Sequence, residues 1–335
     1  MTIILSHFSA LEYYRRTQNV PAVPFDPLIA EGGESFSCKR MLQKLERCGC
    51  GCLPLPIHLL APTGNDRRRS ACASWHVHEG PLPPGALLRI ADGVAVESPE
   101  LCFARLAPAL ARPKLIKIGL ELCGTYALRP DLEEGFAPKR RPSTTIASLK
   151  KLLDSCGPLK GRLEAERALK YLHEGSASPM ETISAMLLFL PYRMGGQALT
   201  KGLLNAEVAA NDYTLALTGK SFLKCDILWP EARLCLEYDS DQHHTGSRRI
   251  AEDASRRAAL TYLGFEMVTM TKHHVLNMEA FNNIALLLAK RLGKRSRGTA
   301  CPPEKQRELR SQIIEFSRGE KSPALTVAKR LSTGR

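Results

Sequence analysis

The 335-residue sequence has no apolar run long enough to cross a membrane. Its longest apolar stretches, AMLLFLPY and IALLLA, fall well short of the roughly 18 residues that a bilayer requires. The first residues, MTIILSHFSALEYYRR, also lack the charged lead and the long apolar segment of a signal peptide. We therefore expect a cytoplasmic protein without a membrane partner.

Acidic side chains are scarcer than basic ones. The chain has 34 Asp and Glu against 47 Lys and Arg, which gives a formal charge of +13. Each phosphate that a basic side chain neutralises releases counterions, so this excess favours a polyanionic partner such as nucleic acid. The apolar fraction of 44% is typical of a folded protein, and the length suggests about two domains.

The eleven cysteines do not form the compact, even-numbered framework of a small secreted domain. Reduced thiols are therefore expected. Cys38, Cys48, Cys50 and Cys52, followed by His58, raise the question of a zinc site. Their C-x9-C-x-C-x-C spacing lacks the paired two-residue knuckles of common zinc sites, so ordinary thiols are favoured and zinc binding stays open.

Patterning divides the chain into four segments. Residues 1–130 predict a mixed α/β domain, with strands in LPIHLLAP, SWHVH and LLRIADGVAVES and a helix that begins after Ser98, a natural N-cap. Residues 131–161 mix Pro, Gly and basic residues around one short amphipathic segment and predict a linker or domain edge. A second domain is expected over 162–293, and a basic tail with one helix over 294–335.

The second domain is also predicted to mix strands and helices. Apolar alternation and helical periodicity predict strands near 213–217, 222–228, 233–239 and 265–271, and helices near 163–173, 179–190, 248–263 and 278–291.

The stretch KCDILWPEARLCLEYDSDQHH, residues 224–244, predicts two strands joined at WPEA. With Pro230 and Glu231 at the centre of the turn, residue 226 would lie opposite residue 235. Strict alternation then gives one face with three carboxylates and one face with apolar side chains. The first face holds Lys224, Asp226, Arg233, Glu237 and Asp239, and the second holds Cys225, Ile227, Leu234, Leu236 and Tyr238.

Carboxylates this close repel one another unless they are solvated or a cation neutralises them. Diagonal neighbours on adjacent strands lie roughly 7–8 Å apart, a distance that one divalent cation bridges. From these residues alone, a polar hairpin face and a metal site are equally favoured.

Four segments in order make this region resemble the PD-(D/E)xK nuclease superfamily. The resemblance is closer to the very-short-patch-repair-like endonuclease domain family, whose E-x-D-G-x-x-H motif is similar to LCLEYDSDQHH. SPMETISAMLLFLP is similar to that family's opening helix, and EDASRRAALTYLGFEMVTMT to its D-x-x-R helix and Leu-x-x-Gly-aromatic junction. The matching positions are Glu181, Asp226, Glu237, Asp239, His243, Asp253, Arg256 or Arg257, Leu263, Gly264 and Phe265.

The resemblance implies a restriction-endonuclease-like core, a mixed sheet flanked by helices, and a Mg²⁺- or Mn²⁺-dependent phosphodiesterase acting on DNA. Asp226 and Glu237 would hold the metal, and Glu181 would complete or orient the set. Asp239 and His243 would position the water or the leaving group. A further expectation is that two arginines, Arg256 and Arg257, contact phosphate.

Two positions depart from these families. The superfamily has Lys where this chain has Asp239, and Lys224 on the same predicted face is a candidate replacement. The closer family usually has Gly where this chain has Ser240, which affects the bend toward His243.

Local explanations compete for several of these residues. Ser178 and Glu181 have the spacing of a helix capping box. His244 matches no family position and is expected in a solvated loop, and His76 and His78 are expected on an exposed strand.

The segment GVAVESPELCFARLA is weakly similar to abortive-infection antitoxin (AbiEi-like) proteins, over residues of about 55–125. This similarity supports a second hypothesis. In it, the nuclease fold is catalytically weak or inactive and the protein is a DNA-binding regulator or antitoxin.

Overall fold

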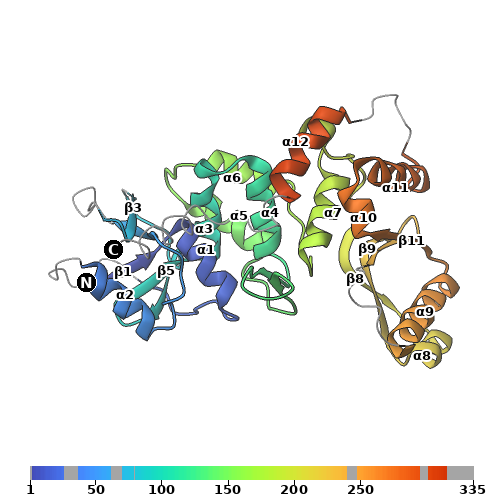
Figure 1. The fold of residues 1–335 in the computed structure, drawn as a ribbon, viewed down its shortest axis with the longest axis horizontal. Coiled ribbons are helices and arrows are strands. Elements are labelled where there is room, and N and C mark those ends of the chain that lie inside the picture. The colour runs from blue at the N-terminus through green and yellow to red at the C-terminus, as the bar shows by residue number, and fades with distance from the viewer. Residues whose placement is uncertain are drawn as a thin grey trace, which may run out of the picture. The chain divides into compact units, whose positions relative to one another are not determined.

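The computed structural model describes residues 2–25, 37–61, 70–78, 80–239, 247–294 and 301–314. The fold is mixed α/β, as expected, with sheets flanked by helices (Figure 1). Contacts divide the chain into two compact units, the first ending at Leu172 and the second beginning at His173. No helix within the described ranges has both the length and the apolar character needed to cross a membrane.

The first unit contains a five-stranded sheet in the order β3-β2-β1-β5-β4 and a short β6-β7 pair. Its strands are β1 (Ile3–Leu5), β2 (Ile57–Ala61), β3 (Ala73–Val77), β4 (Leu87–Ala91), β5 (Val94–Glu97), β6 (Ala127–Leu128) and β7 (Phe136–Ala137). Its helices are α1 (His7–Arg16), α2 (Cys38–Arg47), α3 (Pro99–Leu106), the 3-10 turn η3 (Ala107–Ala109), α4 (Arg112–Leu122), α5 (Ile146–Ser155) and α6 (Arg162–Leu169).

Helix α3 begins as the sequence predicts. The Ser98 side chain accepts a hydrogen bond from Leu101 N at 3.2 Å, and Pro99 occupies the first turn. The cap satisfies one of the amide groups that a helix start leaves without an intrahelical partner.

The first unit extends beyond the end predicted at residue 130. Helix α5 lies inside the segment 131–161 that the sequence marks as a linker, and its Leu152 is part of the core around Ile4 and Leu101. Because three leucines on one face of this helix are buried, the segment packs as part of the unit.

A buried ion pair links β5 to α3. Glu97, fully buried, lies 2.8 Å from Arg105 Nε. Its carboxylate also accepts hydrogen bonds from Ser6 Oγ at 2.7 Å and from His7 N at 2.9 Å. These donors satisfy a charge that would be costly to bury alone.

Three imidazole rings stack beside this ion pair. The His7 and His76 ring centroids are 3.6 Å apart, and His58 Nδ1 lies 2.8 Å from His76 Nε2. Burial lowers the pKa of His58. Burial, followed by the nearby His76, Arg105 and His58 side chains, lowers the pKa of His7 to about 2. The prediction that His76 lies on an exposed strand is wrong, because other rings cover it.

The cysteines of the first unit correct one expectation. Cys38 and Cys72 form a disulfide, so the expectation of reduced thiols fails for this pair. Cys48, Cys50 and Cys52 are free thiols. Among the described residues, these three do not bring ligand atoms together as a metal site would.

The second unit is built on one four-stranded sheet in the order β11-β10-β9-β8. Its strands are β8 (Leu203–Ala209), β9 (Phe222–Trp229), β10 (Leu234–Asp239) and β11 (Glu266–Thr271). Its helices are α7 (Pro179–Phe189), η4 (Tyr192–Met194), α8 (Asp212–Thr218), α9 (Ser247–Tyr262), α10 (Lys272–Leu276), α11 (Met278–Arg291) and α12 (Pro303–Ile314).

The strand predicted near 213–217 is wrong, because these residues form helix α8. Asn211 caps the helix and accepts a hydrogen bond from Thr214 N at 2.9 Å, and Gly219 ends it with a left-handed φ of 67°. Capping residues at both ends stabilise this helix, and they decide its structure over the short alternation of apolar residues that predicted a strand. Strand β8, which pairs with β9, was not predicted.

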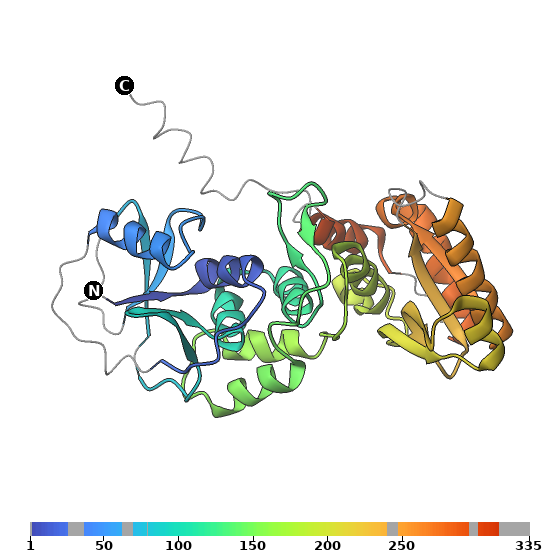
Figure 2. The same cartoon turned by 90° about the horizontal axis from the view of Figure 1, so that it is seen from below.

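Helix α9 connects the parallel strands β10 and β11 and runs alongside the sheet (Figure 2). Its Ala259 and Leu260 pack against Leu223, Cys225 and Cys235. The Phe189 ring of α7 meets the Trp229 ring of β9 edge to face, at 6.1 Å. Helices α9 and α7 therefore each fix a part of β9, the strand that carries Asp226.

We predict that Glu97→Ala lowers the free energy of unfolding of the first unit by about 3–5 kcal/mol, because it leaves the Arg105 guanidinium buried without its partner. Denaturant unfolding checks this value. The matched control is Asp131→Ala, which removes a 44% exposed carboxylate from its pair with Arg129 and should cost less than about 1 kcal/mol. Similar losses in both variants would contradict the role of the buried pair.

Candidate active site

The two central strands of the second unit separate beside the candidate site. Strands β9 and β10 pair as Leu234↔Trp229, Cys235↔Leu228 and Leu236↔Ile227, and the ladder ends there. Beyond the last pair, Tyr238 N donates to the side chain of Asp226, at Oδ2 and 2.7 Å. The Asp226 side chain thus takes the place of a backbone acceptor.

The predicted register is wrong by two residues, since 226 was expected opposite 235. Arg233 adopts a left-handed φ of 45°, and its amide donates to Pro230 O at 3.1 Å. The turn therefore spans 230–233 and is not centred on Pro230 and Glu231. A shift of two residues keeps side chains on the same face, so Asp226 and Glu237 still lie together.

Strict alternation fails along β9. Cys225 and Leu228 both belong to the core that faces α9, although alternation places residues three apart on opposite faces. The prediction that Cys225 lies away from Glu237 is consequently wrong. Ligand atoms of Cys225, Cys235 and Glu237 all lie within 4.8 Å of one another.

An irregularity in β8 holds the second acidic group. Leu204 pairs with Ile227 and Ala206 with Cys225, so Asn205 lies at the position opposite Asp226, with a left-handed φ of 49°. Asparagine tolerates this conformation better than most residues. Its Nδ2 donates to Glu181 Oε2 at 2.5 Å.

Glu181 is buried near the start of α7, and Ser178 caps the helix as predicted. The Glu181 carboxylate accepts from Ala177 N at 2.8 Å, one residue before the cap. Burial raises the pKa of Glu181, while the hydrogen bonds and the charge of nearby Lys224 oppose the rise. Glu181 therefore does more than belong to the first turn of the helix, because its charge also acts on Asp226.

The pKa of the Asp226 carboxyl group is strongly raised at this site. Burial, followed by the charges of Glu237 and Glu181, raises the pKa of Asp226 to about 8. Neighbouring carboxylates raise one another's pKa in this way unless a cation compensates their charge in full. The three predicted acidic residues thus lie within electrostatic reach of one another.

Arg256 of α9 partly compensates this charge. Its Nη1 lies 2.6 Å from Glu237 Oε2 and also donates to Lys224 O at 3.1 Å, and its Nη2 lies 3.6 Å from Asp253. Arg256 is therefore engaged with the carboxylates, whereas Arg257 is exposed. Of the two arginines, Arg257 is the better placed to contact phosphate.

Most of the predicted site residues line one cavity of about 1060 Å³, but Glu181 is not among its lining residues. Strands β9 and β10 supply Lys224, Asp226, Glu237 and Asp239, and α9 supplies Arg256 and Arg257. His243, Ser240 and His244 lie outside the described residues. The remaining lining residues are Tyr213, Leu217, Tyr238, Asp253, Ala254, Ala258, Thr261, Tyr262 and Thr269.

Two tyrosines at this cavity were missed. Tyr213 of α8 and Tyr262 of α9 are 55% and 59% exposed, and their ring centroids are 4.4 Å apart. Single exposed apolar rings are common on surfaces, whereas adjoining ones form a patch of the kind that marks binding sites. No local pattern pairs them, because their contact depends on how α8 packs against α9.

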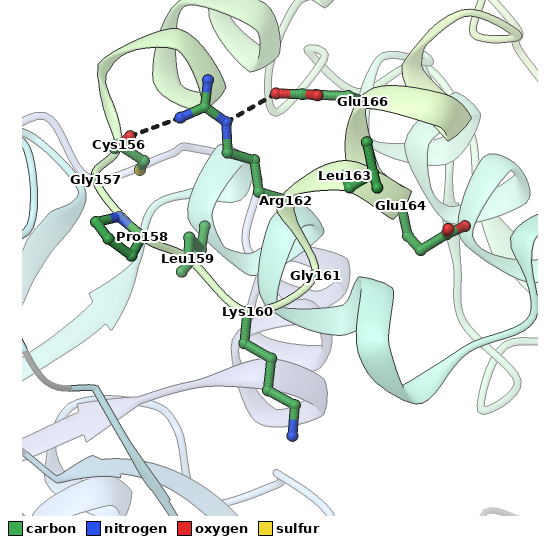
Figure 3. A pocket seen from close by; sticks show the side chains of 10 residues that line it. All are labelled: Cys156, Gly157, Pro158, Leu159, Lys160, Gly161, Arg162, Leu163, Glu164 and Glu166. Atoms are coloured by element: carbon green, nitrogen blue, oxygen red, sulfur yellow. Dashed lines mark hydrogen bonds and ion pairs between the residues drawn. The ribbon is translucent and has the colours of Figure 1, made fainter.

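A second hollow, of about 1100 Å³, lies in the first unit (Figure 3). Residues 156–164 and 166 line it, and Arg162 bridges Glu166 at 2.8 Å and Cys156 O at 2.9 Å. Its lining comes from one stretch of chain and brings no set of carboxylates together. The cavity of the second unit is therefore the better candidate for chemistry.

We predict that Asp226→Asn stabilises the metal-free protein, because the amide keeps the acceptor for Tyr238 N and removes the buried charge. A raised pKa means that the folded state holds a proton that the unfolded state releases. The original chain thus loses stability as pH rises from about 4 to 8, by at most roughly 1.4 kcal/mol per pH unit. Denaturant unfolding at several pH values should show the two proteins converging near pH 4. A constant difference would contradict the assignment.

Comparisons with known proteins show distant relatives. Two are uncharacterized proteins from Mycobacterium tuberculosis, strains CDC 1551 / Oshkosh and ATCC 25618 / H37Rv. Each is 24% identical over 185 residues, which is 55% of this chain and 57% of the relative. The chain thus covers a little more than half of their length. No protein-family model matches the sequence, and no solved structure matches it.

Proposed function

We propose that the protein is a divalent-metal-dependent DNA endonuclease with its active site in the cavity of the second unit. The observation that carries the proposal is the burial of Asp226 close to Glu237 and Glu181; burial first, and then these two charges, raise its pKa to about 8. Such perturbed carboxylates in a cavity are typical of functional sites. The proposal keeps the restriction-endonuclease-like interpretation of the mixed sheet.

The chemistry of the donors supports Mg²⁺ or Mn²⁺, although the ligand atoms of Glu181, Asp226 and Glu237 do not all lie within 4.8 Å of one another. Asp226 and Glu237 offer carboxylate oxygens, the ligands that these hard cations prefer. When bound, the ion would polarise the scissile phosphate and lower the pKa of a coordinated water. Hydrogen bonds from Asn205 Nδ2 and Ala177 N hold the Glu181 carboxylate in place. Glu181 would in turn orient the metal ligands Asp226 and Glu237.

Residues around the carboxylates have separate roles in this proposal. Lys224, whose charge reaches Glu181, supplies the cation that the superfamily has at the position of Asp239. Asp239, at the wall of the cavity, accepts a proton from water or orients it. Arg256 has to release Glu237 as the metal ion binds.

DNA is the substrate that the surface of the cavity fits. Arg257 and Lys224 are exposed cations at its wall, and the formal charge of +13 favours a polyanion. Tyr213 and Tyr262 present adjacent rings on which an unpaired base can stack. Phosphate contacts and stacking together would hold a strand across the carboxylates.

A second candidate function rests on Arg256. Its contact with Glu237 at 2.6 Å neutralises the site without a metal ion. In that case the fold would be inactive, and the protein would act as a DNA-binding regulator or antitoxin, as the AbiEi-like segment suggests. A cytoplasmic location stays a prediction under both functions.

Nicking of supercoiled plasmid with Mg²⁺ or Mn²⁺ tests the proposal. Asp226→Asn and Glu181→Gln should each lower the rate at least about 100-fold, equivalent to about 3 kcal/mol of transition-state stabilisation, and DNA binding should persist. Glu279→Gln, an exposed change on α11, is the control and should leave the rate unchanged. DNA binding without any cleavage by the original chain would instead support the regulator.

A separate prediction concerns the tyrosine pair. Tyr213→Ala or Tyr262→Ala should weaken binding of single-stranded DNA by about 1–3 kcal/mol, because each removes a stacking surface. Tyr213→Phe keeps the ring and should bind normally. Phe222→Ala removes a 56% exposed ring that does not line the cavity and is the matched control. Fluorescence anisotropy measures all four, and equal losses for Tyr213→Ala and Phe222→Ala would refute the role.

A further inference from the structure

Two cysteine thiols lie buried beneath Glu237. Cys225 on β9 and Cys235 on β10 are both fully buried, and Glu237 is 7% exposed. The sulfur atoms and a Glu237 carboxylate oxygen all lie within 4.8 Å of one another. Across the described ranges, no other three Cys, His, Asp or Glu side chains converge in this way.

The spacing suits a soft divalent cation. A zinc ion with Zn–S bonds of about 2.3 Å and a Zn–O bond of about 2.1 Å at tetrahedral angles separates sulfur from oxygen by roughly 3.6 Å. Cys235 Sγ lies 3.3 Å from Glu237 Oε1. Small side-chain rotations would therefore seat the ion, with water or the second carboxylate oxygen as the fourth ligand.

Charge balance also favours such an ion. In the structure Arg256 compensates the Glu237 carboxylate, and the neutral Cys235 thiol donates a hydrogen bond to that carboxylate. A divalent cation that replaces the two thiol protons adds two positive charges and creates two thiolates. The net charge of the buried group stays the same, so a large desolvation penalty is avoided.

We propose that Cys225, Cys235 and Glu237 form a binding site for a thiophilic divalent cation of the Zn²⁺ class. Glu237 lines the cavity and gives the ion a path to the sulfur atoms. Thiolate ligands select zinc over magnesium, which prefers oxygen ligands and rarely loses its full shell of water. The site thus differs from the proposed Asp226 and Glu237 site in its metal and in two of its ligands.

Glu237 is a ligand in both proposed metal sites, so zinc binding would regulate DNA cleavage. This consequence rests on the proposed function. A zinc ion drawn toward Cys225 and Cys235 orients Glu237 away from Asp226 and removes one ligand from Mg²⁺. Zinc binding should therefore inhibit cleavage, and loss of either thiol should relieve the inhibition.

Co²⁺ is the spectroscopic probe for the full chain, kept reduced. Binding should produce a thiolate-to-cobalt charge-transfer band that Zn²⁺ abolishes by displacement, with about two protons released for each ion bound. Cys225→Ser and Cys235→Ser should each remove the band. Cys301→Ser, which changes another buried cysteine of the same unit, should keep it. Replacing Cys48, Cys50 and Cys52 together by Ser should also keep it and exclude the thiols of the first unit.

The original chain gives a second readout that does not depend on folding of the variants. Zn²⁺ should slow alkylation of Cys225 and Cys235, measured by mass spectrometry, and leave Cys301 unaffected. Absence of the band, or a band that survives Cys225→Ser and Cys235→Ser, together with unprotected thiols, would overturn the site.

Cleavage assays then separate the two proposals. If the chain cleaves DNA with Mg²⁺, added Zn²⁺ should inhibit the original chain at least about tenfold more strongly than Cys225→Ser. Equal inhibition would overturn the regulatory consequence. A chain that gives the cobalt band and never cleaves would refute the nuclease and keep the metal site.

Discussion

The second unit depends on one constraint, the repulsion among carboxylates that its fold holds close together. Strands β9 and β10 separate beyond three paired positions, and the Asp226 side chain fills the gap by accepting from Tyr238 N. Three other elements supply compensation, namely the Asn205 amide from β8, the Ala177 amide before α7 and the Arg256 guanidinium from α9. The site is thus assembled from three strands and two helices of the unit, and the pKa of Asp226 remains raised.

The proximity of the carboxylates was predictable from the sequence, although strict alternation fails along β9 and the predicted face of Cys225 is wrong. The register was wrong by an even number of residues, which leaves Asp226, Glu237 and Asp239 on one side. What failed depended on long-range packing. The left-handed Arg233 lengthened the turn, the irregularity at Asn205 has no sequence signature, and β8 forms only because β9 offers it an edge. None of these is visible in local periodicity.

In the first unit too, contacts between near neighbours in the sequence could be predicted, and contacts made by tertiary packing could not. Ser98 and Pro99 mark a helix start from sequence alone, since a cap is a contact between near neighbours. The linker prediction was wrong because the short amphipathic segment between the Pro and Gly residues forms a helix, and a leucine of this helix completes a core made by other elements. The stacked histidines could not be predicted, because elements far apart in sequence bring them together. The Glu97–Arg105 pair joins neighbouring elements, but its burial depends on the packing of the whole unit.

Helix α9 carries two kinds of residue on successive turns. Ala259 and Leu260 belong to the core over Cys225 and Cys235, and Arg256, one turn earlier, reaches Glu237. A substitution that loosens the core would move the guanidinium away from its carboxylate before the unit unfolds. Random mutagenesis should therefore yield temperature-sensitive alleles in this helix, with phenotypes that mimic changes at the carboxylates although the altered residues never touch them.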